Sequence, residues 1–410
     1  MLRFLVAIFA LTFAAQSLSA AKPPTVRPVF HVDARNPTAD KPQSKLWFAR
    51  GTWWAWLPNA NGSGLWRRTD SGWNRQSALD DSLRSLPGRA DVLADGDQVH
   101  AVLVKDRSLS VVELRFDNNA AEYELAADLV RFEVSGDDSG EIIETATIAL
   151  DSRGTRWIAY PWQQRMWVRA KLDEQGTKWT APIAVSDTTS RDDLCAIVTL
   201  PSAVGLAWSN QAEDSMNFRL HQDGDPAEEW GPVEVIERGE HNADDHINAK
   251  VAANGTVLLA TKNSVDQVGE AQLVLRVREP TGRWHNIPYA ARTSTGQPSR
   301  PVVLLAGEPS QLLLLHTLYG SPETGLSHER RNTIVWQATL LAKITAAQLA
   351  GRFQPAIEPG VAINNVTGCK AALPNGVPWI FLASDESGRV YEGRLDPAAI
   401  RDLPRPVNTE

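Results

Sequence analysis

The sequence predicts an all-β protein, a seven-bladed β-propeller of four-stranded antiparallel blades that is closed by an N-terminal strand in the last blade. Three observations predict it. An apolar strand–turn–strand unit recurs seven times, its first strands are spaced by about 53 residues, and Trp often opens its fourth strand. A four-stranded unit with a period of this order is typical of a propeller blade, whereas a pair of packed sheets would not explain seven similar hairpins.

The clearest unit lies between residues 246 and 290. Apolar strands at 246–252 and 256–261 flank Asn254-Gly255, and two further strands follow at 271–278 and 284–290. Asn-Gly between alternating apolar runs is a strong hairpin signal. The other six units are expected to begin near residues 45, 89, 143, 194, 301 and 366.

The seventh unit ends after three strands, near Leu395. We expect Pro28 to Ala34 to supply its fourth strand, because this closure removes the unpaired sheet edges at the join. The longest insert contains one short segment with helical character, at 345–349.

The N-terminus has the layout of a secretory signal peptide. Arg3 precedes an apolar run from Phe4 to Ala15, and small residues follow up to Ala21. We therefore expect a signal peptide at 1–21, a single propeller domain at 22–400 and a C-terminal tail at 401–410. The mature protein would be periplasmic or secreted and would have no membrane span, because no later segment is apolar for long enough.

The amino-acid composition limits the classes of molecule that this protein can bind. The formal charge is −8, and basic residues are scattered along the chain, which argues against nucleic acid. We expect a monomer whose partner is a glycan or another envelope component.

Cys195 and Cys369 occupy equivalent places in the fourth and seventh units, nearly opposite in a seven-fold ring. Because a disulfide needs Cα atoms about 4.4–6.8 Å apart, we predict two free, buried thiols despite the oxidising compartment.

Polar residues gather at predictable places in this topology. All first strands line the central channel in the same direction, so the loops that precede first strands and those that follow second strands share one mouth. We predict that His246, Asp245 and Asp193 are catalytic there. The predicted substrate-binding residues at the same mouth are Arg191, Asn210, Asn248, Lys250, Lys262, Arg300, Asn364, Asn365 and Asp385.

The strings that carry these residues resemble a family of secreted bacterial seven-bladed propeller proteins of uncharacterised function. They are Asp244-Asp245-His246-Ile247-Asn248-Ala249-Lys250, Arg300-Pro301 and Asn364-Asn365-Val366-Thr367, and the resemblance covers about residues 150–395. Cys195 and Cys369 depart from it, since the family has small hydroxylated residues there. More distantly, 173–179 and 279–284 resemble the Asp-box turns of sialidase-like propellers. The catalytic set of true sialidases is not found, so sialidase activity is not implied.

Architecture and export favour the recognition or processing of a carbohydrate at this mouth. A uronate lyase needs a cation for the carboxylate, such as Arg300 or Lys262, or the amide of Asn364, and a base such as His246, Tyr160 or Tyr319. A glycoside hydrolase instead needs two carboxylates, for which Asp193, Asp245 and Asp385 are candidates.

Two other interpretations stay open. The first is a non-catalytic propeller that binds a glycan or a protein of the cell envelope. The second is a structural role, in which the polar residues cap turns and hydrate the channel. No cofactor or metal site is predicted, although Asp192, Asp193, Asp244 and Asp245 have the oxygen ligands that Ca²⁺ prefers.

Overall fold

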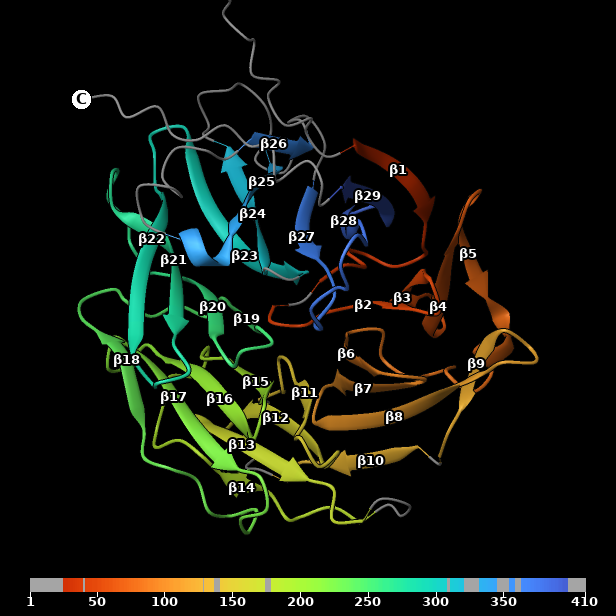
Figure 1. Ribbon diagram of the computed structural model, residues 1–410, viewed down its shortest axis with the longest axis horizontal. Helices are drawn as coiled ribbons and strands as arrows, with labels where there is room; N and C mark the ends of the chain where they lie inside the picture. Colours follow the sequence, from red (N-terminus) through yellow and green to blue (C-terminus); the bar gives the residue numbers. More distant parts are fainter. Residues whose placement is uncertain are drawn as a thin grey trace, which may run out of the picture.

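The computed structural model describes residues 25–39, 41–127, 129–135, 141–173, 178–307, 310–320, 332–344, 354–357 and 363–396. Seven antiparallel sheets surround a central channel (Figure 1). The predicted seven-bladed propeller is therefore confirmed. The segments predicted as the signal peptide, the helical insert and the C-terminal tail lie outside the described residues.

The first strand of every blade lines the channel, and neighbouring first strands contact one another around the ring. Blades one to seven begin with β2 (Leu46–Ala49), β6 (Ala90–Asp95), β11 (Thr147–Leu150), β15 (Cys195–Leu200), β19 (Ile247–Val251), β23 (Gly296–Ala306) and β27 (Ile363–Thr367). We call the end of the channel where these strands begin the proximal mouth, and the end where they stop the distal mouth.

Second and third strands continue each sheet outward. The second strands are β3 (Thr52–Asn59), β7 (Gln98–Lys105), β12 (Arg156–Trp162), β16 (Ala203–Asn210), β20 (Val257–Lys262), β24 (Gln311–Gly320) and β28 (Trp379–Asp385). The third strands are β4 (Gly62–Thr69), β8 (Ser108–Asp117), β13 (Arg165–Ala170), β17 (Ser215–Gln222), β21 (Ala271–Arg278), β25 (Thr333–Leu340) and β29 (Arg389–Leu395).

The outer strands differ most from the sequence-based expectation. They are β5 (Gly72–Gln76), β10 (Val130–Glu133), β14 (Ile183–Ala184), β18 (Glu234–Arg238), β22 (Trp284–Ala291), β26 (Gln354–Ile357) and β1 (Thr25–His31). Blade two carries an additional strand, β9 (Glu122–Leu125), beside β8. Trp230 precedes β18 rather than opening it, because its indole packs edge-on against Trp157 of blade three.

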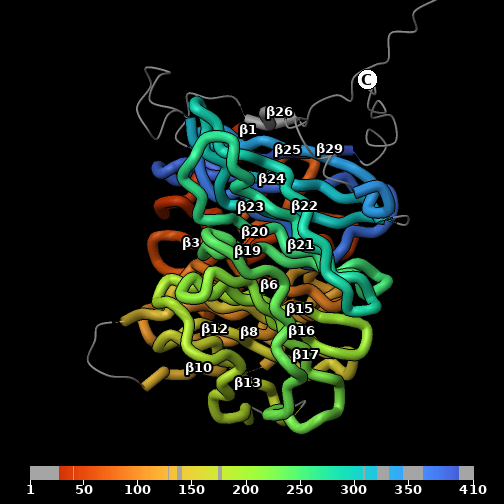
Figure 2. Tube along the Cα trace, turned by 90° about the vertical axis from the view of Figure 1, so that its left-hand side faces the viewer, coloured from red at the N-terminus to blue at the C-terminus, as the bar shows by residue number. Residues whose placement is uncertain are grey.

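The N-terminal strand closes the ring as predicted. β1 pairs antiparallel with β29, from Thr25 opposite Arg394 to His31 opposite Arg389, and the two strands lie side by side in Figure 1. Figure 2 shows that both strands lie at the same end of the molecule. A buried Glu392 on β29 also reaches blade one, where it accepts hydrogen bonds from Arg68 Nε at 2.8 Å and Trp73 Nε1 at 2.7 Å. Blade seven is thus joined to both ends of the described chain.

Side chains between adjacent sheets form the core. Each of the six apolar clusters draws on more than one blade; one joins Trp54 and Trp56 of blade one to Val99 and Leu114 of blade two. An aromatic side chain buries about 150–250 Å², so these contacts dominate the attraction between blades. Most of the Trp side chains thus lie in the core.

Two further predictions can be compared with the structure. Cys195 and Cys369 are buried and free, which confirms the prediction made from their positions on opposite blades. Burial raises the pKa of the Cys369 thiol to about 11, and it raises the pKa of Cys195 as well. Within the described part of the chain, helices are too short and polar to span a bilayer.

Candidate functional site

The chain itself fills the proximal mouth. Residues 41–45, which we call the plug, connect the N-terminal region to blade one, and all but the first are buried. Gln43 Nε2 donates a hydrogen bond of 3.1 Å to the carbonyl oxygen of Ala146 in blade three. The backbone N–H of Ser44 donates one of 2.8 Å to Asp91 Oδ1 in blade two. The plug is therefore tied to several blades at once.

The space left beside the plug is small. A cavity of about 20 Å³ remains, enough for about one water molecule. It is lined by Lys41, Pro42, Gln43, His246, Ile247, Asn248, Arg300, Pro301, Val302, Asn365 and Val366. At the proximal mouth, a ligand larger than water must therefore bind around the plug and not within the channel.

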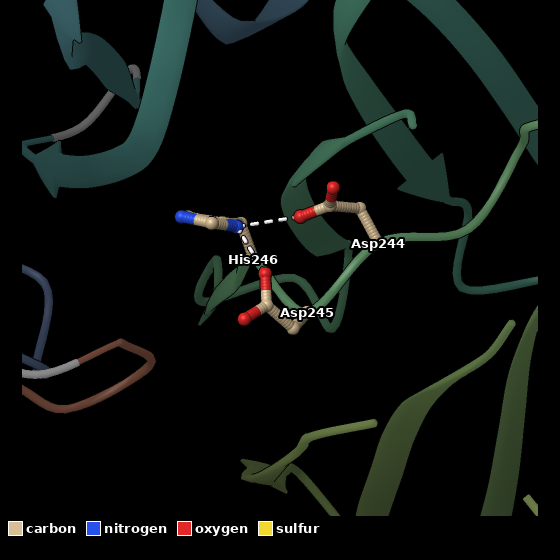
Figure 3. A group of neighbouring side chains, drawn as sticks. All are labelled: Asp244, Asp245 and His246. Carbon is tan, nitrogen blue, oxygen red and sulfur yellow. Dashed lines mark hydrogen bonds and ion pairs between the residues drawn. The ribbon is translucent and has the colours of Figure 1, made fainter. Parts of the chain in front are cut away.

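His246 forms the centre of a charged cluster at this mouth. Its Nδ1 lies 2.5 Å from Asp244 Oδ1 and 2.5 Å from Asp245 Oδ1, while its other ring nitrogen points away from both carboxylates (Figure 3). That second nitrogen, Nε2, lies 3.4 Å from Ser299 Oγ in blade six. Two acceptors at Nδ1 hold the proton there, which leaves Nε2 facing Ser299.

Two lysines complete the cluster. Lys262 Nζ lies 2.5 Å from Asp244 Oδ2, and Lys41 Nζ of the plug contacts Asp245 Oδ2. Burial alone would raise the pKa of Asp245, but the hydrogen bond and charge of His246, together with Lys41, lower it overall. Asp245 is therefore held as a carboxylate, which suits an ion-pair partner and not a general acid.

These contacts help to decide whether the cluster could hold the Ca²⁺ ion considered from the sequence. Ligand atoms of Asp244, Asp245 and His246 lie within 4.8 Å of one another. However, an ammonium group already contacts the outer oxygen of each carboxylate, so the positive charge that a cation would supply is present. The other two candidates, Asp192 and Asp193, lie on blade four. The residues fit an ion-pair network better than a Ca²⁺ site, which prefers six to eight oxygen ligands.

A second group of predicted residues meets between blades six and seven. Arg300 Nε donates a hydrogen bond of 2.7 Å to Asn365 Oδ1, and Arg300 Nη1 contacts the hydroxyl of Tyr319. Tyr319 in turn donates a hydrogen bond of 3.0 Å to Asn364 Oδ1. Arg300 forms no ion pair with any residue that the structure describes, so its charge is shared with neutral oxygens.

The backbone at this contact is unusual. Arg300 has φ +51° and Asn365 has φ +57°, and each lies where the pairing of a first strand with its second strand shifts register. A left-handed conformation costs a residue with a side chain about 1–3 kcal/mol and is concentrated at functional sites. The two bulges aim side chains from neighbouring blades at the same point.

The open space next to these residues is a cleft of about 410 Å³ between blades five and six, which we call the five–six cleft. It is lined by Asp244, Lys262, Ser264, Val265, Asp266, Gln272, Arg292, Gln297, Pro298, Ser299 and Tyr319. Its volume lies within the range of small-ligand sites. The cleft contacts both groups described above, through Asp244 and Lys262 on one side and Tyr319 on the other.

A second cleft of about 410 Å³ lies between blades three and four. Arg191 and Asp192 line it together with Glu144, Trp162 and Arg165. Lys41 of the plug lies 3.6 Å from Glu144 Oε1, so the plug stands between this cleft and the His246 cluster. Of the predicted binding residues, Arg191 is the one that faces this second cleft.

The other predicted residues on blades four and seven serve their own turns. Both carboxylate oxygens of Asp193 accept hydrogen bonds from Gln211 N at 3.1 Å, and burial raises its pKa although these bonds oppose the shift. Asn210 donates to Thr188 O at 3.4 Å. Asp385 Oδ1 accepts from the N–H groups of Ser387 and Arg389 at 3.0 Å. The structure does not bring Asp193 or Asp385 into contact with His246.

Two predicted residues lie deeper in the channel. Asn248 donates to Pro42 O of the plug at 3.3 Å and accepts from the N–H of Val303 at 3.1 Å. Lys250 follows on the same face of β19 and is also buried. They thus support the plug and do not face either cleft.

Several residues at this site were not among those predicted to act there. Lys41 and Arg292 carry no repeat or motif signal, and their roles arise from the path of the plug and from the cleft wall. Ser299 directly precedes the predicted Arg300 at the entry to blade six. Tyr319 was one of two tyrosines considered as a base. The other, Tyr160, is fully buried between blades, and burial raises its pKa, so it cannot contact a ligand.

The fold and the site define a seven-bladed propeller with a closed channel and polar clefts around its proximal mouth. The sequence matches no protein-family model and no curated protein. The resemblance to secreted propellers and to Asp-box repeats stays a prediction.

Among solved structures, the chain is similar to the polysaccharide lyase Uly1, with 10% identity, a TM-score of 0.46, and coverage of 89% of this chain and 92% of that one. It is similar to a prolyl endopeptidase, with 12% identity, a TM-score of 0.44, and coverage of 90% and 51%. It is also similar to the GH93 alpha-L-arabinofuranosidase of Fusarium graminearum, with 10% identity, a TM-score of 0.44, and coverage of 78% and 99%. At these values, function must be argued from the site itself.

Proposed function

We propose that this protein acts outside the cytoplasm on an acidic polysaccharide, which it binds in the five–six cleft and cleaves by β-elimination. The observation that carries the proposal is the position of Tyr319. Its phenol lies in the cleft wall between the guanidinium of Arg300 and the amide of Asn364. Two partners from neighbouring blades thus fix the hydroxyl oxygen of Tyr319 at the edge of the cleft.

In the proposed step, Tyr319 first loses its phenol proton to solvent, and its oxygen then takes the proton from the carbon next to the uronate carboxylate. The electron pair of that C–H bond forms a carbon–carbon double bond, the glycosidic C–O bond on the adjacent carbon breaks, and a proton returns to the leaving oxygen. No water is consumed. General base catalysis of this kind contributes about 10²–10⁴-fold to the rate.

The cleft offers cations for the substrate carboxylate. Lys262 lines it with its ammonium group paired to Asp244, and Arg292 lines it 3.9 Å from Asp266, whose side chain is 94% exposed. The guanidinium of Arg292 also contacts the neutral side-chain amide of Gln297, so its charge is offset only by the exposed Asp266 and can pair with a substrate carboxylate. Because the whole chain has a formal charge of −8, attraction of a polyanion would depend on these local cations.

His246 supports this arrangement from behind the cleft wall. Its Nε2 faces Ser299, which lines the cleft, and its Nδ1 is fixed by two carboxylates. We assign His246 and Asp245 a positioning role. The hydrolase alternative is less well supported, because Asp193 and Asp385 are engaged by their own turns and Asp245 is paired with Lys41.

The test is a panel of uronate-containing and neutral polysaccharides, followed by the ultraviolet absorbance of unsaturated products. Tyr319→Phe should lower kcat by at least about 100-fold and leave binding intact. Tyr391→Phe is the matched control, since its hydroxyl contacts Asp385 at 3.3 Å in blade seven, and it should retain full activity.

Three outcomes would change or overturn the proposal. If acidic glycans bind and Arg292→Ala weakens that binding, but no product forms, the protein is a non-catalytic glycan-binding propeller. If no acidic glycan binds or is cleaved, the proposal is wrong. Full activity of Tyr319→Phe would remove Tyr319 from the chemistry.

A further inference from the structure

The distal end of the channel contains a separate cavity of about 390 Å³. It is formed where the first strands of several blades stop, and its wall includes Leu93, Leu150, Val198, Val251, Lys250 and Lys370. The plug occupies the channel at the opposite, proximal mouth. This cavity is therefore distinct from both clefts described above.

Two lysines line this cavity, and their surroundings differ. Lys370 Nζ contacts Asp91 Oδ2 and donates to the carbonyl oxygen of Ile148 at 2.6 Å, so its charge is neutralised within the protein. Lys250 Nζ donates to Ser44 Oγ and Asn248 Oδ1, both at 3.3 Å. Neither partner is charged, and Lys250 forms no ion pair among the described residues.

Thr199 and Asp151 of the cavity wall are engaged within the protein, and Asp95 lines the cavity at its exposed rim. Thr199 Oγ1 donates to Leu150 O at 2.5 Å, and Asp151 Oδ1 accepts the N–H groups of Arg153 and Thr155 at 2.9 and 2.8 Å. An ammonium group has three donors and Lys250 uses two of them, over long distances. A buried charge without a counter-charge is costly, and a bound anion would offset this cost.

We infer that this cavity binds a small organic monocarboxylate with an apolar body. The carboxylate would pair with Lys250, and the body would cover the apolar wall formed by Leu93, Leu150 and Val198. One uncompensated ammonium matches one negative charge, whereas a phosphate dianion would require further free donors. The volume is within the range of small-ligand sites.

Binding should also depend on pH. Burial lowers the pKa of Lys250 to about 8, and the groups that act on it electrostatically are Cys369, Lys370 and Asp91. A lysine binds an anion in its protonated form. Carboxylate binding is therefore expected below this pKa and should weaken as the pH rises through it.

Benzoate and its neutral analogue benzamide are suitable probes, titrated by calorimetry into the full chain at pH 6.5. We expect benzoate to bind at least tenfold more tightly than benzamide. Lys250→Met should reduce benzoate affinity at least tenfold, while Lys105→Met, an exposed lysine of blade two, should not. Melting temperature verifies that both variants fold.

A second variant keeps the inference testable if Lys250→Met fails to fold. Ala371→Trp changes an exposed residue of the cavity wall and should block benzoate without touching the lysine. Equal binding of benzoate and benzamide, no binding of either, or unchanged benzoate binding in a folded Lys250→Met variant would each overturn the inference. None of these results bears on the five–six cleft, because polysaccharide cleavage is measured separately.

Discussion

Arg300 and Asn365 occupy corresponding bulges in adjacent blades, and both have a left-handed backbone where they meet through a hydrogen bond of 2.7 Å. The paired bulges place Arg300 beside the Tyr319 hydroxyl. Left-handed residues are concentrated at functional sites, and here two of them from adjacent blades contact each other.

Two substitutions of Asn365 distinguish the contribution of its backbone conformation from that of its side chain. Asn365→Gly and Asn365→Ala both remove the acceptor for Arg300 and should reduce any polysaccharide activity to a similar extent. Glycine tolerates φ +57°, whereas alanine does not, so the glycine variant should be more stable by about 1 kcal/mol. Urea unfolding measures the difference. An alanine variant as stable as the glycine variant would contradict the left-handed assignment.

Asp245 should link stability to acid pH. Its pKa is lower in the folded protein than the value of about 3.9 for an unfolded chain, so the carboxylate stabilises the fold above about pH 4. This contribution is lost as the pH falls from there through the folded pKa. Asp245→Asn should lower stability at pH 7 by about 2 kcal/mol, the value of a hydrogen bond to a charged group.

The measurement is the melting temperature of both proteins from pH 7 down to pH 3. The gap between wild type and Asp245→Asn should narrow below about pH 4. Asp192→Asn is the control, because Asp192 is exposed and should produce no gap. A gap that is constant over the whole range would show that Asp245 acts through packing and not through charge.

Glu392 should be important for ring closure. Its carboxylate is 4% exposed and binds Arg68 and Trp73 of blade one. Glu392→Gln leaves a guanidinium without its counter-charge, and loss of one partner of a buried pair costs about 3–5 kcal/mol. Denaturant unfolding should show this loss. Glu124→Gln, which disrupts an exposed pair with Arg115, should change stability by less than about 1 kcal/mol.

Calcium should leave the protein unaffected. Lys41 and Lys262 already supply positive charge at the His246 cluster. We expect neither EDTA nor millimolar Ca²⁺ to shift the melting temperature. An ion bound at 100 times its Kd would add about 2.7 kcal/mol of stability, which a thermal melt detects easily. A clear rise with Ca²⁺ would show that the cluster is a metal site after all.

The blades could be predicted from the sequence because their signals are local. Asn254-Gly255 fixes a hairpin, and the alternation in 246–251 places His246, Asn248 and Lys250 on one face. Closure by the N-terminal strand followed from a blade that lacked its fourth strand. The structure pairs β1 with β29 as predicted, although β1 begins earlier in the chain than expected.

The plug could not be predicted, because residues 41–45 have neither periodicity nor a turn signal. Their positions depend on partners such as Ala146 and Asp91, which are distant in sequence. The first strands of all blades begin at the proximal mouth, but the plug lies between them there. Polar side chains from different blades therefore need not contact one another. Asp193 lies just before a first strand and Asp385 ends a second strand, as expected. Backbone N–H groups of their own turns bind both carboxylates, so neither reaches His246.

Pairing between β1 and β29 also constrains how the molecule can assemble. His31 bonds to the carbonyl of Ser387, a residue 356 positions later in the chain. A ribosome therefore makes the first component of blade seven long before its partners exist. Until then β1 has no sheet to join, and closing so long a loop opposes early pairing through chain entropy. The ring should consequently close in a late, concerted step, and a chain interrupted anywhere before β29 should stay an open, protease-sensitive array of blades.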